Sequence, residues 1–217
     1  MKARTLILWM IFLLAFFALL IGSVDDVYEV VKNNDKCYLY FLGGGILIII
    51  LDMLNKKNKN FLKKTHHEFT HIVVDFITFR EIINLKIDKQ KGSVVSKGND
   101  SMLETSKLAP YCLPLFAYII MIFGCFIASN MSYVYYVVLG MAYTFHLLCI
   151  KLDFRSFKDM GRHQDDINQY PLIFSYSYIL CFWLFNTFIV LISVRSNMLR
   201  AYAFMFESFK ETFSSIF

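Results

Sequence analysis

The sequence predicts a mainly α-helical, polytopic transmembrane bundle that carries a small surface β-hairpin. Hydrophobic residues make up 57% of the 217-residue chain, and charged residues make up only 18%, against roughly a quarter in soluble globular domains. The charges are missing from several long apolar runs. One polar stretch between those runs alternates apolar and polar side chains with the period of a strand.

Five apolar runs are expected to cross the bilayer, because about 20 apolar residues span its hydrocarbon core. Between residues 109 and 150 there is no Asp, Glu, Lys or Arg, and the polar segment Ser129–Ser132 offers a turn between two crossings. The first run also fits a secretory signal peptide, but it is long for one, so we interpret it as a retained anchor. Together the runs predict a single membrane domain over residues 1–217. The expected spans are residues 5–22, 37–54, 109–129, 133–150 and 171–194.

Two other segments have a distinct pattern. Over residues 81–100, Ile83, Leu85 and Ile87 alternate with polar residues, and turn-forming residues precede a second short apolar stretch. This pattern predicts a β-hairpin at the membrane surface, with a polar connecting loop as the alternative. Over residues 198–217, aromatic residues recur at spacings of three and four, which predicts an amphipathic helix on the bilayer surface or against a partner.

Charge and cysteine content exclude some classes of function. The formal net charge of +5 is typical of a membrane protein with cytoplasmic Lys and Arg, so no nucleic-acid partner is expected. The five cysteines lie in or beside apolar runs and form no Cys-x-x-Cys pair. We interpret them as small buried hydrophobic residues.

The chemically distinctive segment is His67-Glu68-Phe69-Thr70-His71, in a helix expected over residues 61–79. His67 and His71 stand one helical turn apart, so both rings can reach one Zn²⁺. In this motif Glu68 does not bind the metal; it takes a proton from water and returns it to the leaving amine. Ionisable groups beside apolar runs are costly and usually functional, so we favour a zinc site over a merely solvated helix face. His66 lies about 100° around the helix and is expected outside the site.

A catalytic zinc needs a third protein ligand and an open position for water. Asp75 lies one turn beyond His71, but a third ligand on one straight helix closes poorly around a tetrahedral ion. His146 lies within an apolar run. It could be a ligand, but we favour its interpretation as a hydrogen-bonded residue of a membrane span. The better source is the segment from Arg162 to Tyr170, which places carboxylates and amides before the last span, with a solvated loop as its alternative.

The order of these features resembles the site-2-protease family of intramembrane zinc metallopeptidases. The specific match is the motif from His67 to His71 at the start of an apolar helix. The positional matches are the hairpin, the segment Leu108–Leu115 before paired spans, and Gln164-Asp165-Asp166 before another span. The resemblance covers about half of the chain. The Asn-Pro-Asp-Gly or Leu-Asp-Gly motif of many relatives is missing, which indicates a divergent member.

The resemblance implies a zinc ion bound by His67, His71 and Asp166, with Asp165 as the alternative third ligand. It implies peptide-bond hydrolysis near the bilayer surface, with Glu68 as general base. The expected substrate is a membrane protein or peptide in the lipid bilayer, held in extended form along the hairpin edge. The oxyanion donors are expected to be Gln164 or Asn168.

The expected location is a bacterial-type cytoplasmic membrane, as a multi-pass protein. Two alternative functions stay open from the sequence. One is a non-catalytic, degenerate membrane protein, in which the zinc site persists without turnover. The other is an ion- or proton-coupled transporter that uses His146 with Asp165 and Asp166.

Overall fold

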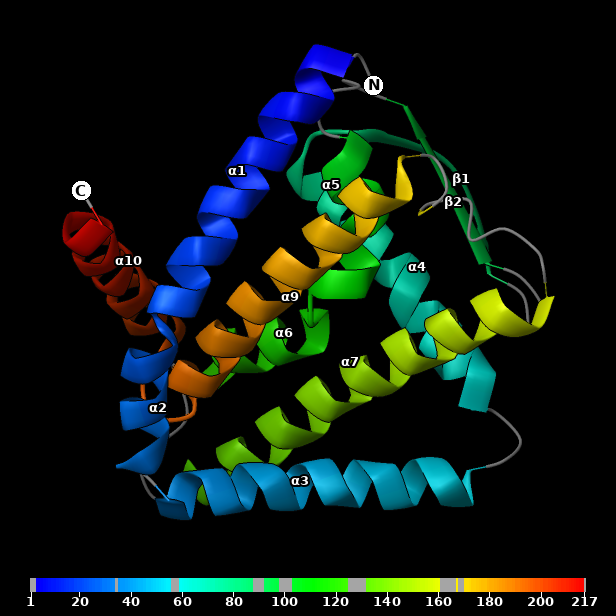
Figure 1. Ribbon diagram of the computed structural model, residues 1–217. Helices are drawn as coiled ribbons and strands as arrows, with labels where there is room; N and C mark the ends of the chain where they lie inside the picture. Colours follow the sequence, from blue (N-terminus) through cyan, green and yellow to red (C-terminus); the bar gives the residue numbers. More distant parts are fainter. Residues whose placement is uncertain are drawn as a thin grey trace.

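The computed structural model of the chain describes residues 3–33, 35–55, 59–87, 92–97, 103–124, 132–160, 167 and 170–216. Over these residues the protein is mainly helical, which confirms the mainly α-helical part of the predicted fold class (Figure 1). The elements in chain order are α1 (Ala3–Gly22), α2 (Val24–Lys32), α3 (Asp35–Leu54), α4 (Lys59–Ile77), β1 (Glu81–Ile87), β2 (Gly92–Lys97), α5 (Leu103–Cys112), α6 (Leu115–Gly124), α7 (Ser132–Met160), α9 (Leu172–Ser193) and α10 (Met198–Ile216).

Within the described ranges, four helical segments are long and apolar enough to cross a membrane. They are Leu6–Lys32, Lys36–Leu54, Tyr133–Phe154 and Leu172–Ser193. The first and second of these expose many large apolar side chains, which water disfavours and lipid accepts. These include Ile7, Leu8, Ile11, Phe12 and Leu14 of α1 and Leu39, Leu42, Ile46 and Ile50 of α3. The chain is therefore a multi-pass membrane protein.

The crossing predicted over residues 109–129 is not one straight helix. α5 ends at Cys112, α6 begins at Leu115, and the two are bent by 73°. Pro114 explains the break, because proline offers no N–H and the residue before it avoids the helical region. The side-chain amide of Asn186 on α9 donates to the Cys112 carbonyl over 3.1 Å, so this helix end has a partner. If the bent pair is one span, the described residues hold up to five crossings.

α3 and α7 cross with their backbones in contact (Figure 1). A Cβ atom on Gly140 of α7 would lie 1.9 Å from the Phe41 carbonyl oxygen of α3. On the facing helix, a Cβ atom on Gly44 would lie 2.0 Å from the Val137 carbonyl oxygen. Small residues at a helix crossing allow membrane helices this close approach. The two glycines therefore set how α7 lies across α3.

α9 packs against α1 and α10 in the other half of the bundle. Leu20 of α1, Ile189 of α9 and Met205 of α10 belong to one cluster of buried apolar side chains. The tail predicted as an amphipathic helix over residues 198–217 forms α10 and exposes Leu199 and Phe206. Its association with the bilayer surface or a partner stays a prediction.

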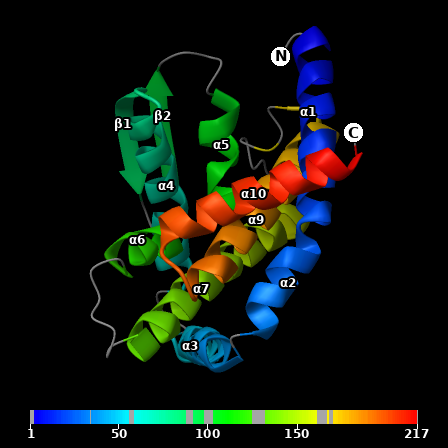
Figure 2. The same ribbon diagram turned by 90° about the vertical axis from the view of Figure 1, so that its left-hand side faces the viewer.

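The two strands lie beside α4 (Figure 2). β1 and β2 pair antiparallel, from Glu81 opposite Lys97 to Ile87 opposite Gly92. Residues 88–91 and 98–100 of the hairpin predicted over 81–100 lie outside the described residues. The strand pair therefore follows directly on the helix that carries the zinc motif.

The helix crossing can be tested with Gly140→Ala. The added Cβ would meet backbone atoms of α3 that cannot rotate away, so we expect about 1–3 kcal/mol of lost stability in thermal unfolding in detergent. Gly43→Ala is the matched control, because a Cβ there meets nothing within 4 Å. Alanine at that position should leave stability unchanged or raise it by about 0.5–1 kcal/mol. Equal effects of the two variants would contradict the close crossing.

Candidate metal centre

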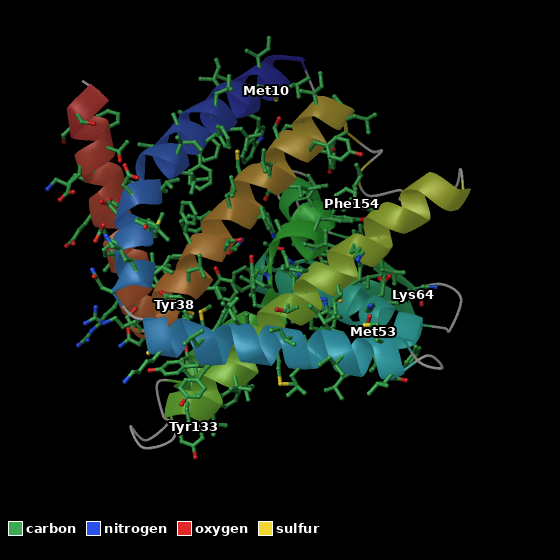
Figure 3. The ribbon with its side chains drawn as sticks, turned by 60° about the horizontal axis from the view of Figure 1, so that its bottom comes forward. Met10, Tyr38, Met53, Lys64, Tyr133 and Phe154 are labelled. Carbon is green, nitrogen blue, oxygen red and sulfur yellow. The ribbon has the colours of Figure 1, made fainter. Side chains whose placement is uncertain are left out.

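α4 carries the predicted zinc motif and is attached by polar contacts to its neighbours. Near its start, Lys63 forms a buried ion pair with Asp52 of α3, with 2.8 Å between Nζ and Oδ1. In Figure 3, the ends of α3 and α7, marked by Met53 and Phe154, lie on the same side of the molecule as Lys64 of α4. The ends of both crossing helices therefore reach the helix that bears the motif.

The rings of His67 and His71 converge as the motif predicts. Their Nε2 atoms lie 3.3 Å apart, and both side chains are largely buried. The helix predicted over residues 61–79 runs from Lys59 to Ile77, so the two residues stand one turn apart in its middle. Helical spacing therefore places the two side chains on the same face of α4, one turn apart.

The outer nitrogen of each ring contacts an oxygen from another element. His67 Nδ1 lies 3.0 Å from Oδ2 of Asp153 on α7. His71 Nδ1 lies 2.9 Å from the carbonyl oxygen of Ser106 on α5. Each ring is thereby held by a different helix, His67 by α7 and His71 by α5.

These contacts set the tautomer of both rings. A carbonyl oxygen and a carboxylate oxygen only accept hydrogen bonds, so each Nδ1–H donates outward. Each Nε2 of the neutral ring then presents a lone pair, and the lone pairs of His67 and His71 face each other across 3.3 Å. Two acceptors at this distance repel each other unless a proton or a cation lies between them.

The arrangement fits a zinc ion. Two imidazole nitrogens bound at about 2.0–2.1 Å and at a tetrahedral angle stand about 3.3 Å apart, which matches the Nε2 separation. Metal-bound histidines usually donate their other N–H to a carboxylate or a backbone carbonyl, and Asp153 and Ser106 supply one of each. His67 and His71 therefore fit two of the ligands of a tetrahedral metal ion, both in the spacing of their Nε2 atoms and in the outward direction of their Nδ1–H groups.

Glu68 lies in the same turn of α4 and is 8% exposed, so the predicted general base is inside the protein. The predicted third ligand, Asp166 or Asp165, and the predicted oxyanion donors, Gln164 and Asn168, lie outside the described residues. Within the described ranges, no third His, Cys, Asp or Glu joins the pair to form a three-residue metal group.

Two other residues considered as ligands have different neighbours. Asp75 Oδ1 accepts from Ser106 Oγ over 2.5 Å and lies 3.2 Å from Arg80 Nε. His146 packs beside His66, with 5.7 Å between ring centroids. The expectation that His146 is hydrogen-bonded is wrong within the described ranges, because neither of its ring nitrogens has a hydrogen-bond partner there. Neither Asp75 nor His146 forms a three-residue metal group with His67 and His71 in the described ranges.

His66 is buried in an aromatic environment, with its ring against Phe116 and Phe145. Its two ring nitrogens have no hydrogen-bond partner in the part of the chain that the structure describes. Burial, and secondarily the charge of His67 when protonated, lowers the pKa of His66 from 6.5 to about 4. The ring is therefore neutral at physiological pH.

Sequence reasoning missed Asp153, Ser106 and Tyr111. Asp153 stands near the end of a long apolar run among basic residues, where a charge is expected at the membrane boundary. Ser106 acts on His71 through its backbone carbonyl, which no side-chain pattern reveals. Tyr111 packs edge-on against His67, with ring centroids 5.3 Å apart. The only sequence signal for Asp153 is that it is a carboxylate between Lys151 and Arg155, just after a long charge-free run.

The fold and this geometry define a class: a multi-pass helical membrane protein with a candidate two-histidine metal centre on a helix held by its neighbours. No protein-family model matches the chain, and no curated protein or solved structure matches it significantly. The assignment of the centre therefore rests on the geometry of the chain itself.

The buried neutral state of His66 predicts a specific acid sensitivity. The unfolded chain takes up a proton near pH 6.5, whereas the native ring does so only near pH 4. The neutral His66 ring therefore contributes fully to the free energy of unfolding above pH 6.5. This contribution is lost as the pH falls from 6.5 to 4, by about 3 kcal/mol in total. Unfolding measured across this range should have a steeper pH dependence in the wild type than in His66→Phe. Parallel curves would show that His66 is not held neutral.

Proposed function

We propose that the chain is a membrane-embedded zinc metallopeptidase that hydrolyses peptide bonds of membrane-associated substrates. The observation that supports it is the facing pair of Nε2 atoms of His67 and His71, 3.3 Å apart, with both Nδ1 atoms on hydrogen-bond acceptors. Glu68, buried in the same helical turn, completes the motif. A bilayer location follows from the spans that surround α4.

Each residue has a defined role in this proposal. His67 and His71 hold the zinc ion, with Asp166 or Asp165 as third ligand. Zinc, when bound, is a Lewis acid that lowers the pKa of a water ligand to about 7 and polarises the scissile carbonyl. Glu68 accepts the proton of the attacking water and returns it to the leaving amine. Asp153 and Ser106 keep both Nδ1 atoms protonated and both rings in binding orientation.

The substrate side of the proposal uses the strand pair, which we place at the membrane surface. Each strand of this pair has one edge without a partner strand among the described residues. An extended peptide can add to such an edge by backbone hydrogen bonds, which exposes a peptide bond that a helix hides. Gln164 or Asn168 would donate to the developing oxyanion. A bacterial-type cytoplasmic membrane is the proposed location.

Metal content and cleavage test the proposal together. The purified protein in detergent should contain about one zinc per chain, and His67→Ala and His71→Ala should lose it, because each removes a ligand. Glu68→Gln should keep the zinc and lower cleavage by about 10²–10⁴-fold, because it removes only the proton acceptor. Cleavage is measured by comparing membrane-protein fragments in cells that express the wild type or Glu68→Gln.

Glu29→Gln is the matched control, because Glu29 is an exposed carboxylate on α2 that pairs only weakly with Lys32. It should keep both zinc and cleavage. Protein without stoichiometric zinc would overturn the metal centre. Zinc retained in His67→Ala would mean that the metal lies elsewhere.

The buried imidazoles of His66 and His146 favour a second candidate, an ion- or proton-coupled transporter. Their four ring nitrogens have no hydrogen-bond partner within the described ranges, which is rare for buried polar groups. In liposomes, such a transporter should lose proton or cation flux in His146→Phe and keep it in Glu68→Gln. A peptidase should show no flux in either variant. A degenerate, non-catalytic protein should bind zinc without any cleavage that depends on Glu68.

A further inference from the structure

Asp75 is almost fully buried, yet it has no role in the mechanism above. Its Oδ1 atom accepts from the Ser106 hydroxyl over 2.5 Å and lies 3.2 Å from Arg80 Nε. A buried carboxylate is costly unless opposite charge and donors surround it. Both partners lie outside α4: Ser106 is on α5, and Arg80 directly precedes β1.

Ser106 contacts α4 with both of its oxygen atoms. Its hydroxyl donates to Asp75, and its carbonyl oxygen accepts from His71 Nδ1 over 2.9 Å. His71 and Asp75 are four residues apart, so they lie on the same face of the helix. The hydroxyl contact therefore fixes the position of the same residue whose carbonyl orients the His71 ring.

Arg80 reaches Asp75 because of the way α4 ends. The Arg80 N–H donates to the Asp75 carbonyl over 2.8 Å, and the Phe79 N–H donates to the Phe76 carbonyl over 3.2 Å. Phe79 is left-handed, with φ 55°. These bonds form the Schellman pattern of helix ends, with Phe79 where glycine is usual. The chain thereby reverses direction after α4, and Arg80 packs against the end of that helix.

We propose that Asp75 is a positioning residue for His71, acting through Ser106, with Arg80 as its charge partner. The inference rests on the proposed function, because it takes His71 as a metal ligand. Asp75 touches neither metal nor substrate. It holds in place the carbonyl that keeps His71 Nε2 turned toward His67, and outer partners of this kind typically change metal affinity by about 10–100-fold.

Zinc affinity tests the inference directly. Zn²⁺ is titrated into the metal-free full-length protein in detergent, in competition with a chromophoric chelator. Asp75→Ala and Ser106→Ala should each raise the Kd for zinc by about 10–100-fold. The double variant should raise it no further than the larger single effect, because both residues act along one path.

Asp26→Ala is the matched control. Asp26 also accepts from a serine hydroxyl, that of Ser208, but this contact joins α2 to α10. Its loss should leave the Kd for zinc unchanged. A second readout is the visible absorption spectrum of the Co²⁺-loaded protein, which reports the orientation of the ligands. The spectrum should shift in Asp75→Ala, which removes the acceptor of the Ser106 hydroxyl, and stay unchanged in Asp26→Ala.

The outcomes separate the inference from the proposed function. An unchanged Kd in Ser106→Ala and Asp75→Ala, while His67→Ala abolishes binding, overturns the inference and leaves the zinc centre intact. Binding as tight in His67→Ala as in the wild type overturns both. If Asp75→Ala does not fold, Ser106→Ala decides the question, because it keeps the Asp75–Arg80 pair.

Discussion

The facing Nε2 atoms of His67 and His71 are the constraint on which the rest of the candidate centre depends. Helical spacing brings the two rings together, but spacing leaves each ring free to turn. The carboxylate of Asp153 and the carbonyl of Ser106 remove that freedom, since each accepts the proton of an Nδ1 atom. The result is a pair of lone pairs 3.3 Å apart, which is stable only with a cation or a proton between them.

The surrounding bundle places these acceptors. The glycine contacts at Gly44 and Gly140 let α3 and α7 cross at backbone distance, and the far ends of both helices then reach α4. α7 contributes Asp153, and α3 contributes Asp52 as the partner of Lys63. α5, which is separated from α6 at Pro114, contributes the Ser106 carbonyl as the acceptor for His71. Two of the candidate membrane spans, α3 and α7, thus each hold α4 through an aspartate side chain.

Much of the fold follows from local sequence, and much of the centre does not. Charge-free runs predict α1, α3, α7 and α9, because lipid allows few charges over about 20 residues. The histidine pair is predicted because its spacing is local. Asp153 is 86 residues from His67 and Ser106 is 35 from His71, so nothing in the local pattern links them. The bend at Pro114 was likewise hidden within a continuous apolar run, although proline gave a physical reason for it.

X-ray absorption at the zinc edge of the purified protein tests the central claim most directly, because it measures the atoms bound to the metal. We expect two imidazole nitrogens at about 2.0–2.1 Å, with oxygen atoms as the remaining neighbours and no sulfur. His71→Ala, which is expected to lose its zinc on purification, can be loaded with excess zinc for the same measurement. Its imidazole signal should then be half that of the wild type. A spectrum with sulfur neighbours, or with no imidazole, would contradict a metal centre built on His67 and His71.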